Sequence, residues 1–148
     1  MRFFKVALIA VMLFLGVGCA ATGPKYSDIA STIPSLSGNK GRIFFFRPDT
    51  MLGAAVTSDI RLNGKVVGRS ERGSFFFADE APGSMTVMTS TEVEKQLTFK
   101  LAAGETKYVR TTVSFGVLVG RINSALVNGS EAKAEIEGLA YTGVPLKK

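Results

Sequence analysis

The stretch "GRIFFFRP" (residues 41–48) decides the fold, because consecutive side chains of an extended strand point to opposite sides. Ile43 and Phe45 share one face of the expected strand, and Phe44 and Phe46 share the other. A short strand that is apolar on both faces is typical of one covered on both sides. The stretch therefore predicts a central strand in a layered β protein.

Turn signals divide the rest of the domain into further short strands. Asn63-Gly64 favours a two-residue hairpin turn, because both central positions need positive φ. Residues 94–115 have the clearest hairpin pattern, in which apolar and polar residues alternate before a turn at 102–105 and a Val- and Thr-rich return. Residues 116–127 are compatible with a strand, a loop or an amphipathic segment.

The fold expected from these signals is all-β. About seven short strands, with turns every 8–12 residues, predict an antiparallel β-sandwich of the Ig-like or transthyretin-like kind. Asn128 and Glu131 have the spacing of a helix capping box, and apolar residues recur at helical spacing after them. We therefore expect a short C-terminal helix over residues 130–139. The phenylalanines are expected to fill the core, with a ligand pocket as the alternative.

The N-terminus has the pattern of a bacterial leader. Arg2 and Lys5 precede an apolar run over residues 6–18, which is shorter than the roughly 20 residues that span a bilayer. A basic start and a short apolar core are typical of a secretory signal peptide. Small residues lead into Cys19, the single cysteine of the chain, as in the lipobox of bacterial lipoproteins. This resemblance implies cleavage between Gly18 and Cys19 and acylation of Cys19.

The expected organisation has three parts. Residues 1–18 form the signal peptide, expected as an N-terminal signal helix, residues 19–40 form the lipidated cysteine and a Ser-, Thr-, Gly- and Pro-rich tether, and residues 41–148 form the sandwich domain. Three apolar residues interrupt the tether. As an alternative to a free tether, they pack part of it onto the domain: Ile29, Ile33 and Leu36.

The charge balance is modestly basic. Of the 18 lysines and arginines, Arg2 and Lys5 lie in the leader, which leaves 16 against 12 carboxylates. This excess suits a protein beside anionic lipid headgroups, and its scatter argues against nucleic acid. The densest basic group is expected on solvated strands and turns, with contact to membrane phosphate or lipopolysaccharide as the alternative: Arg42, Arg47, Arg61, Lys65, Arg69 and Arg72.

The domain resembles a known family. The segments "GRIFFFRP", "IRLNGKVVG", "FFFADEAPGSMTV", "TFKLAAGETKYVR" and "SFGV" are similar to the bacterial lipoproteins of domain-of-unknown-function family 2846, over about residues 40–141. The resemblance implies a β-rich, lipid-anchored envelope protein and supplies no catalytic residue or cofactor. The turn before the strand at 84–91 also resembles small transthyretin-like or PEGA-like modules, which is a likeness of fold alone.

Catalytic patterns are sparse. The chain has no histidine, so the commonest general base and metal ligand are missing, and its one cysteine is assigned to lipid. We therefore expect no catalytic residue, no metal ligand and no cofactor. The alternatives for hydrolysis are Glu92 with Glu94, about 7 Å apart on one strand face, and a Ser-Lys pair assembled by the fold.

The sequence thus predicts a non-enzymatic, lipid-anchored lipoprotein of the cell envelope that acts in interaction or scaffolding. Ala20 after the cysteine favours the outer membrane, facing the periplasm. The expected partners are the membrane and another envelope protein, which would dock on Val117, Val119 and Ile122; core packing is the alternative for these residues. A second function is the binding of a small ligand or glycan through tyrosines, with three candidates: Tyr26, Tyr108 and Tyr141.

Overall fold

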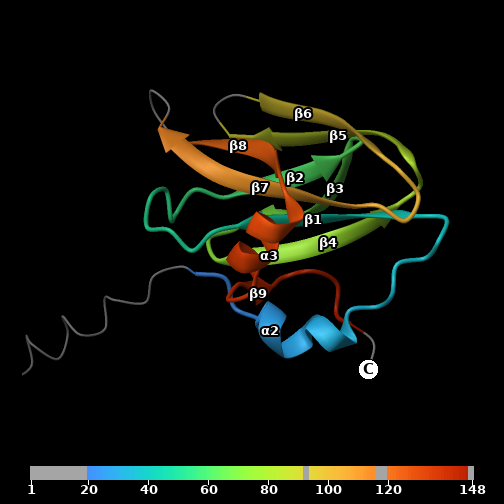
Figure 1. The fold of residues 1–148 in the computed structure, drawn as a ribbon. Helices are drawn as coiled ribbons and strands as arrows, with labels where there is room; N and C mark the ends of the chain where they lie inside the picture. Colours follow the sequence, from blue (N-terminus) through green and yellow to red (C-terminus); the bar gives the residue numbers. More distant parts are fainter. Residues whose placement is uncertain (1–19, 92–93, 116–119, 147–148) are drawn as a thin grey trace, which may run out of the picture.

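Two β-sheets lie face to face in the computed structural model, which describes residues 20–91, 94–115 and 120–146 (Figure 1). One sheet has five strands in the order β8-β7-β1-β4-β9, and the other has four in the order β3-β2-β5-β6. The predicted all-β sandwich with a short C-terminal helix is confirmed. The signal helix expected over residues 1–18 lies outside the described residues, and the Ig-like or transthyretin-like variant stays a prediction.

The elements have the following bounds. The five-stranded sheet contains β1 (Gly41–Arg47), β4 (Ser74–Glu80), β7 (Thr106–Phe115), β8 (Gly120–Val127) and β9 (Ala140–Tyr141). The four-stranded sheet contains β2 (Ser58–Leu62), β3 (Lys65–Ser70), β5 (Gly83–Ser90) and β6 (Glu94–Leu101). The helical elements are α2 (Tyr26–Ile29), the 3-10 helix η1 (Ala30–Thr32) and α3 (Gly129–Ile136).

Strand β1 is buried along its whole length, as its aromatic run predicts. It lies between β4 and β7 in the middle of the five-stranded sheet. On the face toward the second sheet, Phe45 stacks on Phe76 of β4 with ring centroids 5.0 Å apart. Phe76 in turn faces Gly68 of β3, where a Cβ atom would lie within 2.5 Å of the ring. The prediction of core packing is confirmed for these phenylalanines.

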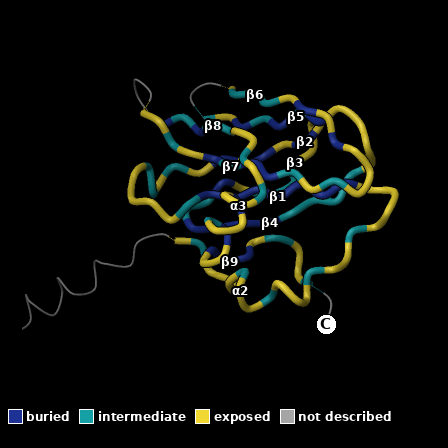
Figure 2. Tube along the Cα trace, in the orientation of Figure 1, coloured by how far each residue is buried: buried dark blue, intermediate teal, exposed yellow. Residues whose placement is uncertain are grey.

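A third layer covers the other face of the five-stranded sheet. Phe44 stacks on Tyr108 of β7 with centroids 5.4 Å apart and meets Tyr26 of α2 edge-on at 6.4 Å. Helix α3 adds Ala132 and Ile136, which are both buried. Figure 2 shows the buried residues concentrated in the strands, whereas α2 and the loops are mostly exposed. The aromatic strand is therefore covered on one side by a sheet and on the other by short helices and coil.

Helix α3 begins as its capping signal predicts. The Asn128 side chain accepts a hydrogen bond of 2.9 Å from the Glu131 backbone amide. The helix ends at Ile136, so the prediction of helix is wrong for residues 137–139. The chain turns there because the Leu139 amide bonds back to the Ile136 carbonyl. Leu139 is still buried, so its side chain packs in the core after the helix has ended.

One predicted hairpin is confirmed and another is wrong. Asn63 and Gly64 have φ of 48° and 84°, and they join β2 to β3. Residues 94–115 do not form a hairpin, because β6 pairs with β5 in one sheet while β7 pairs with β1 and β8 in the other. The connection at 102–105 crosses between the sheets. The β1–β7 pair is parallel, as is the β4–β9 pair, so the sandwich is not purely antiparallel.

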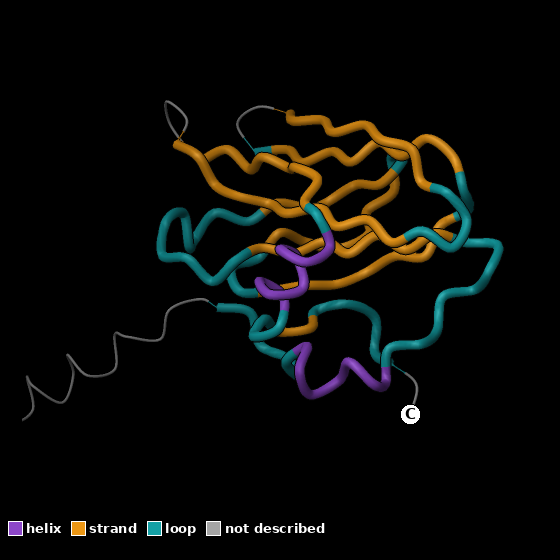
Figure 3. The backbone as a smooth tube through the Cα atoms, in the orientation of Figure 1, coloured by secondary structure: helices purple, strands orange, loops and turns teal. Residues whose placement is uncertain are grey.

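The segment before β1 is attached to the domain. The Tyr26 amide donates to the Leu139 carbonyl at 3.1 Å, and the Tyr141 amide donates to the Pro24 carbonyl at 2.8 Å. Ile29 and Ile33 pack against the core. In Figure 3 the helix in this segment lies beside the C-terminal strand. The prediction of a free tether is therefore wrong for described residues 20–33. The alternative, in which Ile29 and Ile33 pack onto the domain, is confirmed. Leu36 is half-buried.

Two arginines expected in solvent are buried. The Arg42 guanidinium donates to both oxygens of Asp79, at 2.6 and 2.7 Å, and to the Pro34 carbonyl at 2.8 Å. It also lies 4.4 Å from the centroid of the Phe77 ring. The second is Arg47, which is 2% exposed. The expectation that these two arginine side chains face solvent is wrong, because backbone and carboxylate acceptors replace water as their hydrogen-bond partners.

The remaining members of the basic group keep contact with solvent. Arg61, Lys65 and Arg69 are exposed, as predicted. Arg72 is half-buried and binds Asp49.

Replacing Phe45 with alanine tests the central position of β1. We expect Phe45→Ala to lower the free energy of unfolding by about 3–5 kcal/mol, because it opens a cavity beside Phe76. Chemical denaturation measures this loss. Phe115→Ala is the matched control, since that ring is exposed and its loss is expected to cost under about 0.5 kcal/mol. Equal losses from the two variants would contradict the assignment.

Replacing Gly23 with alanine tests the docking of the N-terminal segment. A Cβ atom at Gly23 would lie 2.2 Å from the backbone carbonyl oxygen of Tyr141, so the segment must detach. We expect faster hydrogen exchange at the Tyr26 and Tyr141 amides, which bond across this contact. Gly38→Ala is the control, because no atom lies within 4 Å of its Cβ position. Unchanged exchange in Gly23→Ala would refute the docking.

Candidate functional site

Most of the residues proposed from the sequence for anchoring and docking lie outside the described part of the chain: Gly18, Cys19, Val117 and Val119. The next residue after the predicted anchor, Ala20, is exposed. The Ala21 amide then donates to the Arg72 carbonyl at 2.9 Å. The described chain therefore starts at the domain surface and is held there from its second residue.

Ile122 is the described member of the predicted docking face. It is 1% exposed, and its carbonyl accepts a hydrogen bond of 2.8 Å from the Thr89 hydroxyl of β5. The interpretation of Ile122 as a core residue is confirmed, and its use as a surface contact is wrong. Strand β8 was one of three alternatives for this stretch, and its alternation turns Ile122 inward against the second sheet.

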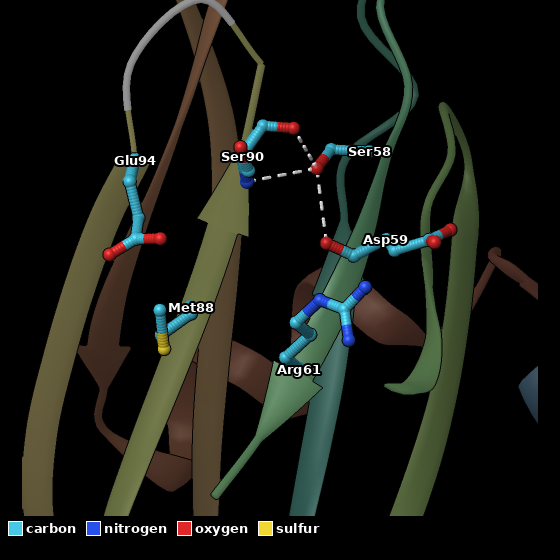
Figure 4. A pocket seen from close by; sticks show the side chains of 6 residues that line it. All are labelled: Ser58, Asp59, Arg61, Met88, Ser90 and Glu94. Carbon is cyan, nitrogen blue, oxygen red and sulfur yellow. Dashed lines mark hydrogen bonds between the residues drawn. The ribbon is translucent and has the colours of Figure 1, made fainter. Parts of the chain in front are cut away.

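A polar cleft of about 340 Å³ lies on the four-stranded sheet (Figure 4). Strands β2 and β5 supply most of its wall, and Glu94 comes from the start of β6. Asp59 is paired with Arg69 outside the cleft at 3.4 Å. The residues that line it are Ser58, Asp59, Arg61, Met88, Ser90 and Glu94.

The one buried hydroxyl of this cleft, that of Ser58, is occupied by backbone groups. The Ser58 hydroxyl donates to the Ser90 carbonyl at 2.7 Å and accepts from the Ser90 amide at 3.1 Å. These bonds join β2 to β5 where their regular pairing ends. A nucleophilic serine needs a base within hydrogen-bond reach, and the Ser58 hydroxyl has only carbonyl and amide partners there. Ser58 thus has a structural role in this geometry.

The carboxylates considered for hydrolysis are not brought together in the described structure. Glu92 lies outside the described residues, so its pairing with Glu94 stays a prediction. Asp79 is held by Arg42 on the other sheet. Within residues 20–91, 94–115 and 120–146, no group of three Cys, His, Asp or Glu residues is placed to bind a metal ion.

The three tyrosines proposed for ligand binding belong to the core. Tyr108 and Tyr141 are buried and Tyr26 is half-buried, which argues against sugar stacking on exposed rings, and Tyr141 also borders an apolar groove. The Tyr141 hydroxyl donates to the Val144 carbonyl at 2.8 Å. Burial raises the pKa of Tyr108, and the neighbouring Tyr26 raises it further. Burial also raises the pKa of Tyr141, against the opposing charge of Arg42.

An apolar groove of about 480 Å³ was not predicted from the sequence. It lies between the α2–η1 segment and the chain after β9. Its size falls in the range of small-molecule sites, and its lining is mostly apolar. The signal that could have found it is weak, because its residues are far apart in the sequence: Pro24, Ile29, Thr32, Tyr141, Gly143, Pro145 and Leu146.

The geometry defines a three-layered β-sandwich with a docked N-terminal segment, a polar cleft and an apolar groove. A family model described as a protein of unknown function (DUF2846) matches residues 37–124, and the chain belongs to this family. It is also similar to an uncharacterized protein of Haemophilus influenzae, with 28% identity over 142 residues, covering 93% of this chain and 83% of the relative. No solved structure matches.

The described helices are short. Among the residues with assigned structure, none forms a helix with the length and apolar character needed to cross a bilayer.

The buried tyrosines predict a loss of stability in alkaline solution. A raised pKa in the folded state means that Tyr108 contributes stability below the unfolded pKa of about 10, and that this contribution is lost as pH rises past it. We expect the free energy of unfolding to fall between about pH 8 and about pH 11, and to fall less in Tyr108→Phe. Denaturant titrations at both pH values measure this. Equal falls in the two proteins would count against the burial argument.

Proposed function

We propose that this protein is a lipid-anchored lipoprotein of the cell envelope whose β-sandwich serves as a non-enzymatic interaction or scaffolding module. Cleavage would fall between Gly18 and Cys19, and the acylated cysteine would hold the domain on the membrane. Ala20 after the cysteine favours the outer membrane, with the domain in the periplasm. The partners are the membrane itself and another envelope protein.

The anchor is supported by the place of the strands along the chain. All nine described strands lie after residue 40, so removal of residues 1–18 takes no strand from the described sheets. Ala20, the residue after the proposed attachment site, is exposed. Two or three acyl chains on one residue provide a stable anchor, since each buried CH₂ contributes about 0.8 kcal/mol.

The described side chains favour a binding role over catalysis. The Ser58 hydroxyl holds two strands together, and the buried tyrosines stabilise the core. The chain has no histidine to serve as a general base. A second candidate, the binding of a small apolar ligand, is favoured by the groove beside Ile29 and Tyr141. Binding of a glycan has less support, because the tyrosine rings are in the core.

Replacing Cys19 with serine tests the anchor. We expect Cys19→Ser to lose the acyl mass, to retain the leader and to fractionate differently from the wild type, because serine has no thiol to alkylate. Intact-mass analysis and membrane fractionation in the native host measure these effects. Thr22→Ser is the matched control and should fractionate as the wild type does. A serine variant that matures and fractionates normally would refute the lipoprotein assignment.

A further inference from the structure

Three segments far apart in the sequence meet at one end of the sandwich. Residues 20–21 line a shallow cleft together with Ala54 and Ala55, from the loop that connects β1 to β2. The same loop packs on the β7–β8 strands, because the Cβ position of Gly53 lies 2.4 Å from a Val113 methyl carbon. Figure 1 shows this loop, the ends of β7 and β8 and the start of the described chain on the left side of the molecule. We call this region the entry end.

The entry end carries exposed apolar side chains. Six large apolar side chains are exposed in the described part of the chain, and three of them lie here. Met51 is 75% exposed and Leu52 is 52% exposed, both at the tip of the β1–β2 loop. Phe115, at the end of β7, is 77% exposed. Apolar side chains gathered at one end of a protein mark a contact with a partner or a membrane.

A buried charge holds the loop in place. The Arg47 guanidinium donates to the carbonyl groups of Gly53 and Val56, and its burial lowers the pKa of Arg47 with a further contribution from Arg72. A turn bond of 3.1 Å joins the Ala54 amide to the Met51 carbonyl. The backbone of the loop is therefore fixed from inside, and Met51 and Leu52 point outward without packing on the core.

The charges at the entry end are largely paired. The Arg72 guanidinium binds the Asp49 carboxylate at 2.5 Å, and Arg69 lies 3.4 Å from Asp59 and 3.8 Å from Glu71. These pairs leave little excess positive charge for anionic headgroups. Attraction between the entry end and a membrane would therefore come from apolar contact, without a need for anionic lipid.

The length of chain before the domain limits where a membrane can lie. Ala21 is bonded to the domain surface, and two residues of extended chain reach about 7 Å at most. A lipid on residue 19 would therefore hold the entry end close to the bilayer. A tether of about 20 residues would instead have allowed a root-mean-square span of roughly 25 Å.

We infer that Met51, Leu52 and Phe115 insert into the interfacial region of the membrane and fix the orientation of the domain. The entry end then faces the bilayer. This inference rests on the proposed anchor at Cys19. The four-stranded sheet then projects sideways, open to a partner in the periplasm. The docked N-terminal segment holds the domain close to the proposed lipid anchor.

A lipid-quenching experiment on the acylated protein tests this orientation. Leu52→Cys is labelled with an environment-sensitive fluorophore and reconstituted in phosphatidylcholine vesicles that contain brominated lipid; the thioether of Cys19 does not react with the label. We expect the label at position 52 to be quenched at least twofold more than a label at Val66→Cys. Val66 is the matched control, because it is 50% exposed and follows the Asn63-Gly64 turn at the other end of β2.

A second variant shows whether the apolar contact is responsible. Adding Met51→Asp and Phe115→Asp to Leu52→Cys should lower the quenching to the level at position 66, since charged groups do not enter the bilayer readily. Both residues are exposed, so the fold should survive. Quenching that is unchanged by the two aspartates would overturn the inference.

Flotation of the vesicles separates this inference from the proposed anchor. If the protein floats with the vesicles but positions 52 and 66 are quenched equally, the anchor stands and the orientation is wrong. A label at 52 that is shielded from water but not quenched would mean that protein, not lipid, covers the entry end, which also overturns the inference. If the wild-type protein does not float, the anchor itself fails.

Discussion

The structure depends on one constraint, which is that β1 and its neighbour β4 are apolar on both faces. A strand of this kind is stable only if two separate layers exclude water from it. The four-stranded sheet covers Phe45 and Phe76, and the helical layer covers Phe44 and Phe75. The order of the layers, and the position of each terminal segment, follow from this need for two covers.

The need for a second cover changes the role of the N-terminal segment. Tyr26 packs edge-on against Phe44 and Phe75, so the residues after the predicted anchor form part of the domain. Arg42 strengthens this attachment by binding the Pro34 carbonyl as well as Asp79. A buried pair of this kind contributes little net stability, because the loss of hydration offsets the attraction between the charges. The bond from Arg42 to the Pro34 carbonyl holds the residues before β1 against the five-stranded sheet.

The limits of sequence reasoning are clear at particular residues. Alternation of apolar and polar residues identified β6 and β7 as strands. It does not indicate which strands pair, and β6 and β7 belong to different sheets. Arg47 was expected in solvent because its type is rarely buried, and the carbonyl groups of Gly53, Val56 and Ser70 make its burial tolerable. The apolar loop containing Met51 and Leu52 is visible in the sequence, yet its position beside residue 20 is not.

The sequence by itself determined strands β1 to β7, the Asn63-Gly64 turn, the cap of α3 and the all-β class, because each depends on neighbours a few residues apart. The tertiary structure alone decided the parallel pairing of β1 with β7, the crossing between sheets at residues 102–105 and the docking of residues 20–33. It also decided that Ile122 and the tyrosines are core residues. These features depend on which distant apolar surfaces are buried against each other. That burial is determined by contacts between residues far apart in the sequence, which no local pattern contains.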